Sequence, residues 1–174
     1  MITDRITSAT PADVPSLNRL INSAYRGDSS RLGWTTEADL LDGIRTDEAG
    51  LLAMLAHPQA TILTYRDGET PLGCVYLEVQ GDALYLGMLT VAPALQDRGI
   101  GRQLLAAAEA FAHERGCRSI VMTVIPERHE LLAWYERRGY RPTGETKPFP
   151  SDPRFGIPRR PLSFIVLKKE LPTG

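Results

Sequence analysis

The most regular alternation of apolar and polar positions lies between residues 83 and 115 of the chain. It opens with a segment whose successive side chains alternate between two faces, as in a strand: Leu84, Tyr85, Leu86, Gly87, Met88 and Leu89. Pro93 ends this segment, because proline has no amide proton to donate to a ladder. From Gly101 onward the apolar residues return at helical spacing: Leu104, Leu105, Ala108 and Phe111. The pattern therefore predicts a strand, a tight turn over residues 96–101 and a long helix.

The part of the chain before this stretch is predicted to be mainly helical. A short strand at residues 5–7 precedes a helix whose start is marked by Thr10 as a cap and Asp13 three residues later. The apolar stripe of that helix consists of Val14, Leu17, Leu20, Ile21 and Ala24. Further helices are expected at residues 36–41 and 49–56. The long polar connections between these helices are typical of a lid that faces a substrate.

The remaining apolar segments have the lengths and turn signals of a sheet. The predicted strands are residues 61–65, 72–79, 83–91, 119–125, 140–141 and 162–167. The first three form an antiparallel meander, and the fully apolar fourth is reached by a right-handed helical crossover. A helix over residues 130–138 is closed by Gly139, and a proline-rich loop spans 147–161. The prediction is an α/β fold with a mixed, mostly antiparallel central sheet flanked by helices.

Composition limits the class of protein. The chain has 174 residues, 43% of them hydrophobic, which is enough for one domain with a real core, so residues 1–174 are predicted to form a single domain. A net charge of −1 argues against a nucleic-acid surface or a basic membrane face. The start of the chain does not resemble a secretory signal, and the two cysteines, Cys74 and Cys117, stand in apolar surroundings. A reducing, cytoplasmic location is expected.

The turn between strand and helix has the chemistry of an anion site. The first turn of a helix has amide protons without an internal acceptor, and the helix dipole adds positive potential there. Glycine at positions 99 and 101 removes the side chains that would keep a phosphate away from those amides. Arg98 and Arg102 add positive charge at the rim. The alternative, a tight connector with glycine there for packing, accounts for the turn taken alone about equally well.

Two common phosphate motifs do not match this turn. A dinucleotide-binding fingerprint requires a third glycine near position 104, where Leu104 stands, and a carboxylate about twenty residues after the first glycine. A P-loop requires Lys and then Ser or Thr after the last glycine, where Arg102 and Gln103 stand. What the chain does contain is Gln-x-x-Gly-x-Gly after a strand that ends in Val-x-Pro.

This pattern resembles the GNAT family of N-acetyltransferases, mainly over residues 72–140. The resemblance implies that the turn holds the diphosphate of acetyl-CoA. It also implies that the strand bulges and splays from its neighbour, so that its amides bind pantetheine and the thioester carbonyl. The implied cofactor-binding residues are Leu89, Thr90, Val91, Gln96, Asp97, Arg98, Gly99, Ile100, Gly101 and Arg102.

A second motif, residues 128–140, is similar to the last helix of the same family, which ends in Tyr-Glu-x-x-Gly-Phe. Tyr135 occupies the tyrosine position, and the resemblance implies that it protonates the departing thiolate of coenzyme A. A core role for the same ring is the alternative, and the two roles are compatible. The asparagine expected seven residues earlier is Arg128 here, which could meet a phosphate, the substrate or solvent.

The general base and the acceptor are less visible in the sequence. Glu78 and Glu127 are the candidate bases, with a solvated surface carboxylate as the alternative for each. The three histidines share no metal-ligand spacing with cysteines or carboxylates, so no metal is expected.

The predicted function is transfer of the acetyl group of acetyl-CoA to a primary amine of a small molecule or peptide, by direct attack in a ternary complex. The alternative is a non-catalytic sensor that binds coenzyme A. No nucleic acid or membrane partner is expected, and a homodimer is left open.

Overall fold

The computed structural model describes residues 5–25, 41–42, 47–96, 98–148, 157–158 and 163–172. Within these residues, the helices are η1 (Pro11–Asp13), α1 (Val14–Tyr25), α2 (Glu48–Ala56), η3 (Pro93–Leu95), α3 (Ile100–Glu114) and α4 (His129–Arg137). The strands are β1 (Ile6–Ser8), β2 (Leu41–Asp42), β3 (Ala60–Asp67), β4 (Thr70–Gln80), β5 (Ala83–Val91), β6 (Ser119–Val124), β7 (Arg141–Pro148), β8 (Ile157–Pro158) and β9 (Ser163–Glu170). None of the described helices is long and apolar enough to cross a membrane.

Seven strands form one sheet in the order β1-β3-β4-β5-β6-β9-β7. The strands β3, β4 and β5 make the predicted antiparallel meander, with turns at Gly68 and Gly81, which both have positive φ. The pairing of β5 with β6 is parallel, and α3 forms the crossover between them. All other pairs in this sheet are antiparallel. The predicted mixed, mostly antiparallel sheet is therefore confirmed.

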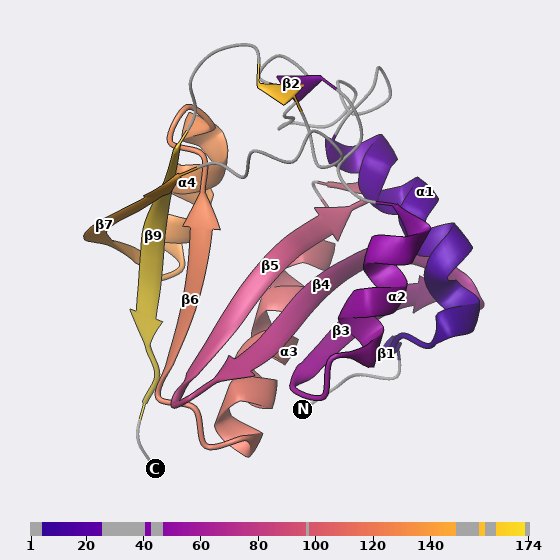
Figure 1. Ribbon diagram of the computed structural model, residues 1–174, viewed down its shortest axis with the longest axis horizontal. Coiled ribbons are helices and arrows are strands. Elements are labelled where there is room, and N and C mark those ends of the chain that lie inside the picture. Colours follow the sequence, from indigo (N-terminus) through magenta and orange to yellow (C-terminus); the bar gives the residue numbers. More distant parts are fainter. Residues whose placement is uncertain are drawn as a thin grey trace.

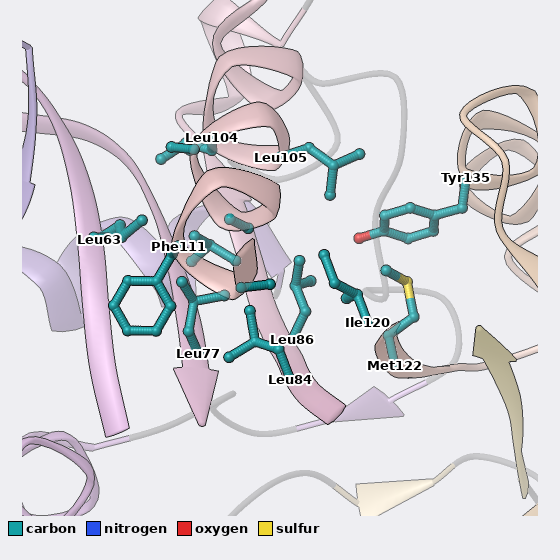
Figure 2. Packing of buried hydrophobic residues seen from close by; sticks show 14 of the residues in the cluster. Leu63, Leu77, Leu84, Leu86, Leu104, Leu105, Phe111, Ile120, Met122 and Tyr135 are labelled. Atoms are coloured by element: carbon teal, nitrogen blue, oxygen red, sulfur yellow. The ribbon is translucent and has the colours of Figure 1, made fainter. Parts of the chain in front are cut away.

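Helices cover both faces of the sheet, with α1 and α2 in front of it and α3 behind it in Figure 1. The two faces have separate apolar clusters. The larger cluster joins α3 to β4, β5 and β6, and Figure 2 shows Phe111 of α3 next to Leu77, with Leu84 and Leu86 close by. The smaller cluster joins α1 and α2 to the other face of β3, β4 and β5. Burial of these apolar side chains supplies the main favourable term in folding.

A glycine on β4 allows α3 to approach the sheet closely. A Cβ atom built on Gly73 would lie 2.9 Å from the carbonyl oxygen of Thr90 and 3.0 Å from Cγ2 of Ile100, closer than packed atoms normally come. The first residue of α3 therefore lies directly against β4. This contact fixes where the N-terminus of α3 stands relative to the end of β5.

Two expectations need correction. Leu41 was expected to end a helix over residues 36–41, but it lies in β2, which pairs antiparallel with β8, while residues 36–40 fall outside the described residues. A partner more than a hundred residues away explains why local pattern did not predict this pairing. The strand expected at 140–141 is the longer β7, which extends to Pro148 because β9 supplies its ladder. Most of the predicted loop at 147–161 lies outside the described residues.

Candidate active site

Strand β5 separates from β6 after only three paired positions. The parallel ladder joins Ala83 to Ser119, Leu84 to Ile120 and Tyr85 to Val121, and then ends. Beyond this point β5 continues with β4 as its partner, and β6 continues with β9. Figure 1 shows the two strands diverging toward their C-terminal ends. The splay that the family resemblance implied is thus present between β5 and β6.

A bulge lies in the part of β5 that has separated from β6. Cys74 pairs with Thr90 and Tyr76 with Gly87, so Met88 and Leu89 together oppose one residue of β4. Met88 has a φ of 51°, a left-handed conformation that costs a methionine about 1 kcal/mol. The hydroxyl of Thr90 donates to the carbonyl oxygen of Met88 at 2.8 Å and helps to hold this conformation. Met88 consequently faces the α1 side, and the alternation expected through residue 89 is broken there.

The turn after β5 has the geometry of an anion-binding helix start. The short helix η3 follows Ala92, and the side-chain amide of Gln96 donates to the carbonyl oxygen of Val91 at 3.2 Å, which ties the turn to the end of β5. Gly99 is the N-cap of α3 with a φ of 80°, where any other residue would be strained. The first-turn amides of α3 point out of the helix end without intrahelical acceptors.

The second glycine of the turn is not required by packing within the protein. A Cβ atom built on Gly101 would lie 3.5 Å from the Trp134 ring and 3.7 Å from the Val91 side chain, which are ordinary contact distances. Gly101 therefore lies between the end of β5 and helix α4, and the chain itself would accept a methyl group there. Close approach of a ligand to the helix start accounts for the glycine better than the packing alternative does.

The predicted cofactor residues fall into one region, with one exception. Leu89, Thr90 and Val91 lie at the bulge and the end of β5. The turn brings the others to the start of α3, namely Gln96, Arg98, Gly99, Ile100, Gly101 and Arg102. Asp97 lies outside the described residues. Arg98 and Arg102 are exposed, while Ile100 and Gly101 are buried.

Tyr135 lies on α4 with its ring in the larger apolar cluster. It is 4% exposed and makes edge contacts with Trp134 and Tyr140, with ring centroids 5.2 and 5.8 Å away. Figure 2 shows its hydroxyl directed away from α4, toward the region of Leu105 and Ile120. The expected core packing of this ring is therefore observed. Its catalytic role stays a prediction.

Two residues near Tyr135, namely Trp134 and Arg138, were not assigned a role from the sequence. Trp134 lies against Gly101, and the Arg138 guanidinium stacks on the Trp134 ring with its carbon 3.9 Å from the ring centroid. An aromatic residue four positions before an arginine on a helix is a signal that could have suggested this stacking. Arg128, for which solvent exposure was one alternative, is buried at 7% exposure at the N-cap of α4.

A polar cluster lies on the sheet face that α1 and α2 cover. The Tyr76 hydroxyl donates to Oε1 of Glu78 at 2.5 Å, and Nε2 of Gln80 donates to Oε2 at 2.8 Å. The Tyr76 hydrogen bond, followed by that from Gln80, lowers the pKa of Glu78 below its ordinary value. Burial, followed by the Glu78 carboxylate, raises the pKa of Tyr76. Glu78 is therefore an ionised carboxylate at neutral pH, held by two donors that recur every second residue on one strand.

This cluster borders the bulge. Tyr76 pairs with Gly87 and Glu78 with Tyr85, which is the last residue of β5 that pairs with β6. The Tyr85 ring covers Gly87 so closely that a Cβ atom there would come within 3.0 Å of it. Tyr76 and Tyr85 make an edge contact with centroids 6.3 Å apart.

Glu127, the other candidate base, lies in the turn after β6. No group of three His, Cys, Asp or Glu side chains that could hold a metal ion occurs within the described parts of the chain.

Comparison with solved structures shows which class of protein has this fold. The fold matches the PaiA N-acetyltransferase from Thermoplasma acidophilum, crystallised in complex with coenzyme A. The TM-score is 0.72 at 17% identity, and the match covers 95% of this chain and 97% of that one. The fold is thus that of known N-acetyltransferases.

Sequence comparison assigns the family. Residues 17–140 match the Acetyltransferase (GNAT) family, and the chain belongs to that family. It is 30% identical to mycothiol acetyltransferase of Rhodococcus erythropolis over 139 residues, which cover 75% of this chain and 44% of the relative. It is 26% identical to aminoglycoside N(6')-acetyltransferase type 1 of Salmonella typhimurium over 133 residues, which cover 71% of this chain and 92% of the relative. The chain thus spans less than half the length of mycothiol acetyltransferase.

Proposed function

We propose that the chain transfers the acetyl group of acetyl-CoA to a primary amine of a small molecule or peptide, by direct attack in a ternary complex. The observation that carries the proposal is Gly101, a buried glycine at the start of α3 that packing does not require. It stands beside a bulged strand that has separated from its neighbour. The family match and the names of the two relatives, both acetyltransferases, support the same activity.

The residues of this region suit acetyl-CoA, which when bound supplies a thioester carbonyl carbon for attack. The first-turn amides of α3 and the positive end of its dipole bind the diphosphate, and Arg98 and Arg102 add charge at its rim. Asp97 stays a predicted member of this group. Backbone amides at residues 89–91 bind the pantetheine arm and stabilise the negative charge that develops on the carbonyl oxygen.

Two side chains of the chain move protons in this proposal. Glu78 attracts a cationic acceptor, which loses one proton to water so that its neutral nitrogen can attack the thioester carbonyl carbon. After the new carbon–nitrogen bond has formed, Glu78 accepts the second proton that the nitrogen loses. Its low pKa suits this order of events, because the nitrogen becomes a far stronger acid once it has bonded to the carbonyl carbon. Tyr135 donates its hydroxyl proton to the departing sulfur. Solvent then restores both groups, so the products are an amide and a free thiol.

The test is release of free thiol from acetyl-CoA in the presence of a panel of small amines and peptides with free N-termini. Turnover with at least one amine is expected. Tight coenzyme A binding without turnover across the panel would instead establish the non-catalytic sensor. Absence of coenzyme A binding would reject both the acetyltransferase and the sensor hypothesis.

The proton acceptor has its own test. Glu78→Gln keeps the size of the side chain and removes its charge, so kcat/KM for the amine is expected to fall about 100-fold. Glu127→Gln is the matched control, because it neutralises the other candidate base, and little change is expected from it. The reverse pattern would assign the role to Glu127.

Three broader statements stay proposals. Residues 1–174 form one acetyltransferase domain, the protein works in the cytoplasm, and a homodimer is one of its states. The cytoplasmic proposal is supported by two free cysteines, Cys74 and Cys117, which are both buried, because reducing compartments keep thiols unpaired. Sedimentation of the purified protein would decide its oligomeric state.

A further inference from the structure

The Glu78 cluster, made of Tyr76, Glu78 and Gln80, holds a carboxylate at both of its oxygens. Glu78 is half-buried on β4, on the sheet face that α1 and α2 cover. Its Oε1 accepts from the Tyr76 hydroxyl at 2.5 Å, and its Oε2 accepts from the Gln80 amide at 2.8 Å. A glutamate on an open surface samples several rotamers, so these two bonds fix the direction in which the carboxylate points.

The two donors of the cluster are not equivalent. Gln80 is exposed, so its side chain is free to follow the carboxylate. Tyr76 is 8% exposed, and its ring packs in the smaller apolar cluster together with Met88. Its bond to Glu78 is at the short end of the range for a hydroxyl that donates to a charged oxygen. Tyr76 is therefore the donor that sets the position of the carboxylate.

The Tyr76 ring is itself tied to the bulge in β5. Tyr76 pairs with Gly87, the residue before Met88. The Tyr85 ring covers Gly87, where a Cβ atom would lie 3.0 Å from Cε2 of Tyr85, and the same ring makes the edge contact with Tyr76. Gly87 thus leaves the room that Tyr85 needs beside Tyr76. The carboxylate consequently has a fixed relation to the backbone amides to which the proposed function assigns the thioester.

We propose that Tyr76 is a positioning residue for acetyl transfer, and that it holds the Glu78 carboxylate where it receives the proton of the acceptor nitrogen. Tyr76 touches no reacting atom in this scheme and acts through Glu78 alone. The inference rests on the proposed function, because it assumes that Glu78 is the proton acceptor. It adds a reason why this carboxylate is tied to a buried tyrosine.

The same bond influences when Glu78 is charged. The Tyr76 hydrogen bond, followed by that from Gln80, lowers the pKa of Glu78, burial raises it, and the His57 charge at the end of α2 lowers it further. Tyr85 is the titratable residue that pairs with Glu78 from β5, whereas its partner on β3 is an alanine and the α1 residues of the smaller cluster are apolar. Removal of the Tyr76 hydroxyl alone therefore raises the pKa of Glu78 and leaves the other groups in place.

The kinetic experiment compares two tyrosines of similar burial. Tyr76→Phe keeps the packed ring, so kcat/KM for the best amine is expected to fall about tenfold at neutral pH while the Kd for coenzyme A stays at the wild-type value. In a Glu78→Gln background the same substitution should change kcat/KM by less than about twofold, because Tyr76 acts through Glu78. Tyr65→Phe is the matched control. Tyr65 is 9% exposed on β3, its ring packs in the larger cluster on the other face, and its variant should keep the wild-type kcat/KM.

The Glu78 carboxyl can also be observed directly. A carbon-13 NMR titration of protein labelled at its glutamate carboxyls reports the charge of Glu78, whose signal is assigned by its loss in Glu78→Gln. The midpoint is expected at higher pH in Tyr76→Phe than in the wild type, and unchanged in Tyr65→Phe. Gln80→Leu removes the second donor and should move the midpoint in the same direction by less. Because Gln80 is exposed, this variant keeps the test valid if Tyr76→Phe is poorly folded.

Each other outcome rejects a defined statement. Wild-type kcat/KM in Tyr76→Phe, where Glu78→Gln is impaired, rejects the positioning role and leaves the proposed function standing. An unmoved midpoint, or an equal loss of kcat/KM in the Glu78→Gln background, shows that Tyr76 does not act through Glu78 and also rejects the inference. Full activity of Glu78→Gln rejects Glu78 as the proton acceptor, and the role of Tyr76 with it, while the turnover itself supports acetyl transfer. No turnover with any amine rejects the proposed function and this inference together.

Discussion

Residues 83–85 of β5 are hydrogen-bonded to a strand on each side, whereas residues 87–91 pair with β4 alone. In the first half, Leu84 is fully buried against α3 and the alternation of side chains is regular. In the second half, Met88 has positive φ, Gly87 is covered by Tyr85, and the strand leads into the turn before α3. The comparison teaches that one strand can contribute to the core over half its length and to the proposed acetyl-CoA site over the rest.

The largest expected effect is on the chemistry proposed beside the second half of β5, through Tyr135 of the neighbouring helix α4. Tyr135→Phe removes one hydroxyl and retains the ring that packs in the core, so kcat should fall about 100-fold or more, the usual contribution of a general acid. The melting temperature and the affinity for coenzyme A should stay close to wild type. Steady-state kinetics with the best amine, together with thermal unfolding, measure this. A Tyr135→Phe enzyme with full kcat would mean that another group, or water, protonates the thiolate.

The next effect separates the ligand contacts of the turn from the packing of β4. Gly101→Ala adds a methyl group that the protein tolerates, so the unfolding temperature should hold while the Kd for coenzyme A rises at least about tenfold. Gly73→Ala adds the same methyl group at a point where a Cβ atom meets the Thr90 carbonyl oxygen at 2.9 Å. It should lower the free energy of unfolding by about 1–3 kcal/mol. Unchanged coenzyme A affinity in Gly101→Ala would show that the glycine serves the fold and not the ligand.

The same contrast explains what the sequence could predict. The regular helices and strands could be predicted from the hydrophobic pattern, because burial imposes periodicity on them. Gly116 and Gly139, which were expected to end helices, have the positive φ typical of that position. The turn at Gly99 and Gly101 could be found because its chemistry depends on backbone amides next to each other in the chain. The bulge at Met88 contradicted the alternation, since a non-glycine residue with positive φ has no local signal.

Contacts between segments that are distant in the sequence could not be predicted either. The Arg138 stack on Trp134 is local, but its position beside Arg102 depends on how α4 and α3 meet. The pairing of β2 with β8 joins segments that no pattern relates. The Glu78 cluster was predictable only in part. Tyr76, Glu78 and Gln80 share one face of a strand, which the spacing of the residues indicates, but the position of the cluster beside the bulge depends on the β4–β5 register.

A smaller effect is expected from a contact outside both halves of β5. The Arg66 guanidinium donates two hydrogen bonds to the Asp13 carboxylate, at 2.9 and 2.8 Å, and joins the start of α1 to the end of β3. Asp13→Asn should lower the free energy of unfolding by about 1–2 kcal/mol near neutral pH and leave coenzyme A affinity unchanged. Urea unfolding monitored by circular dichroism measures the loss.

The pH dependence of this contact has a definite sign. The Arg66 hydrogen bonds lower the pKa of Asp13 below its ordinary value of 3.8, so the folded state binds this proton less readily than the unfolded state does. The stabilisation is complete above about pH 4 to 5, and it is lost as the pH falls through the lowered pKa of the folded state. The difference between wild type and Asp13→Asn should therefore shrink on acidification. A difference that grows toward low pH would contradict the assignment.

The smallest expected effect comes from the ring next to Tyr135. Tyr140 is fully buried, burial raises the pKa of its hydroxyl, and that hydroxyl has no hydrogen-bond partner among the described residues. Tyr140→Phe removes a buried polar group that has no compensating bond, so the protein should gain up to about 1 kcal/mol of stability. It should also retain kcat, which makes it the matched control for Tyr135→Phe, because the two rings are in edge contact. A loss of more than about 1 kcal/mol in urea unfolding would show that the hydroxyl is satisfied in solution, for example by a buried water.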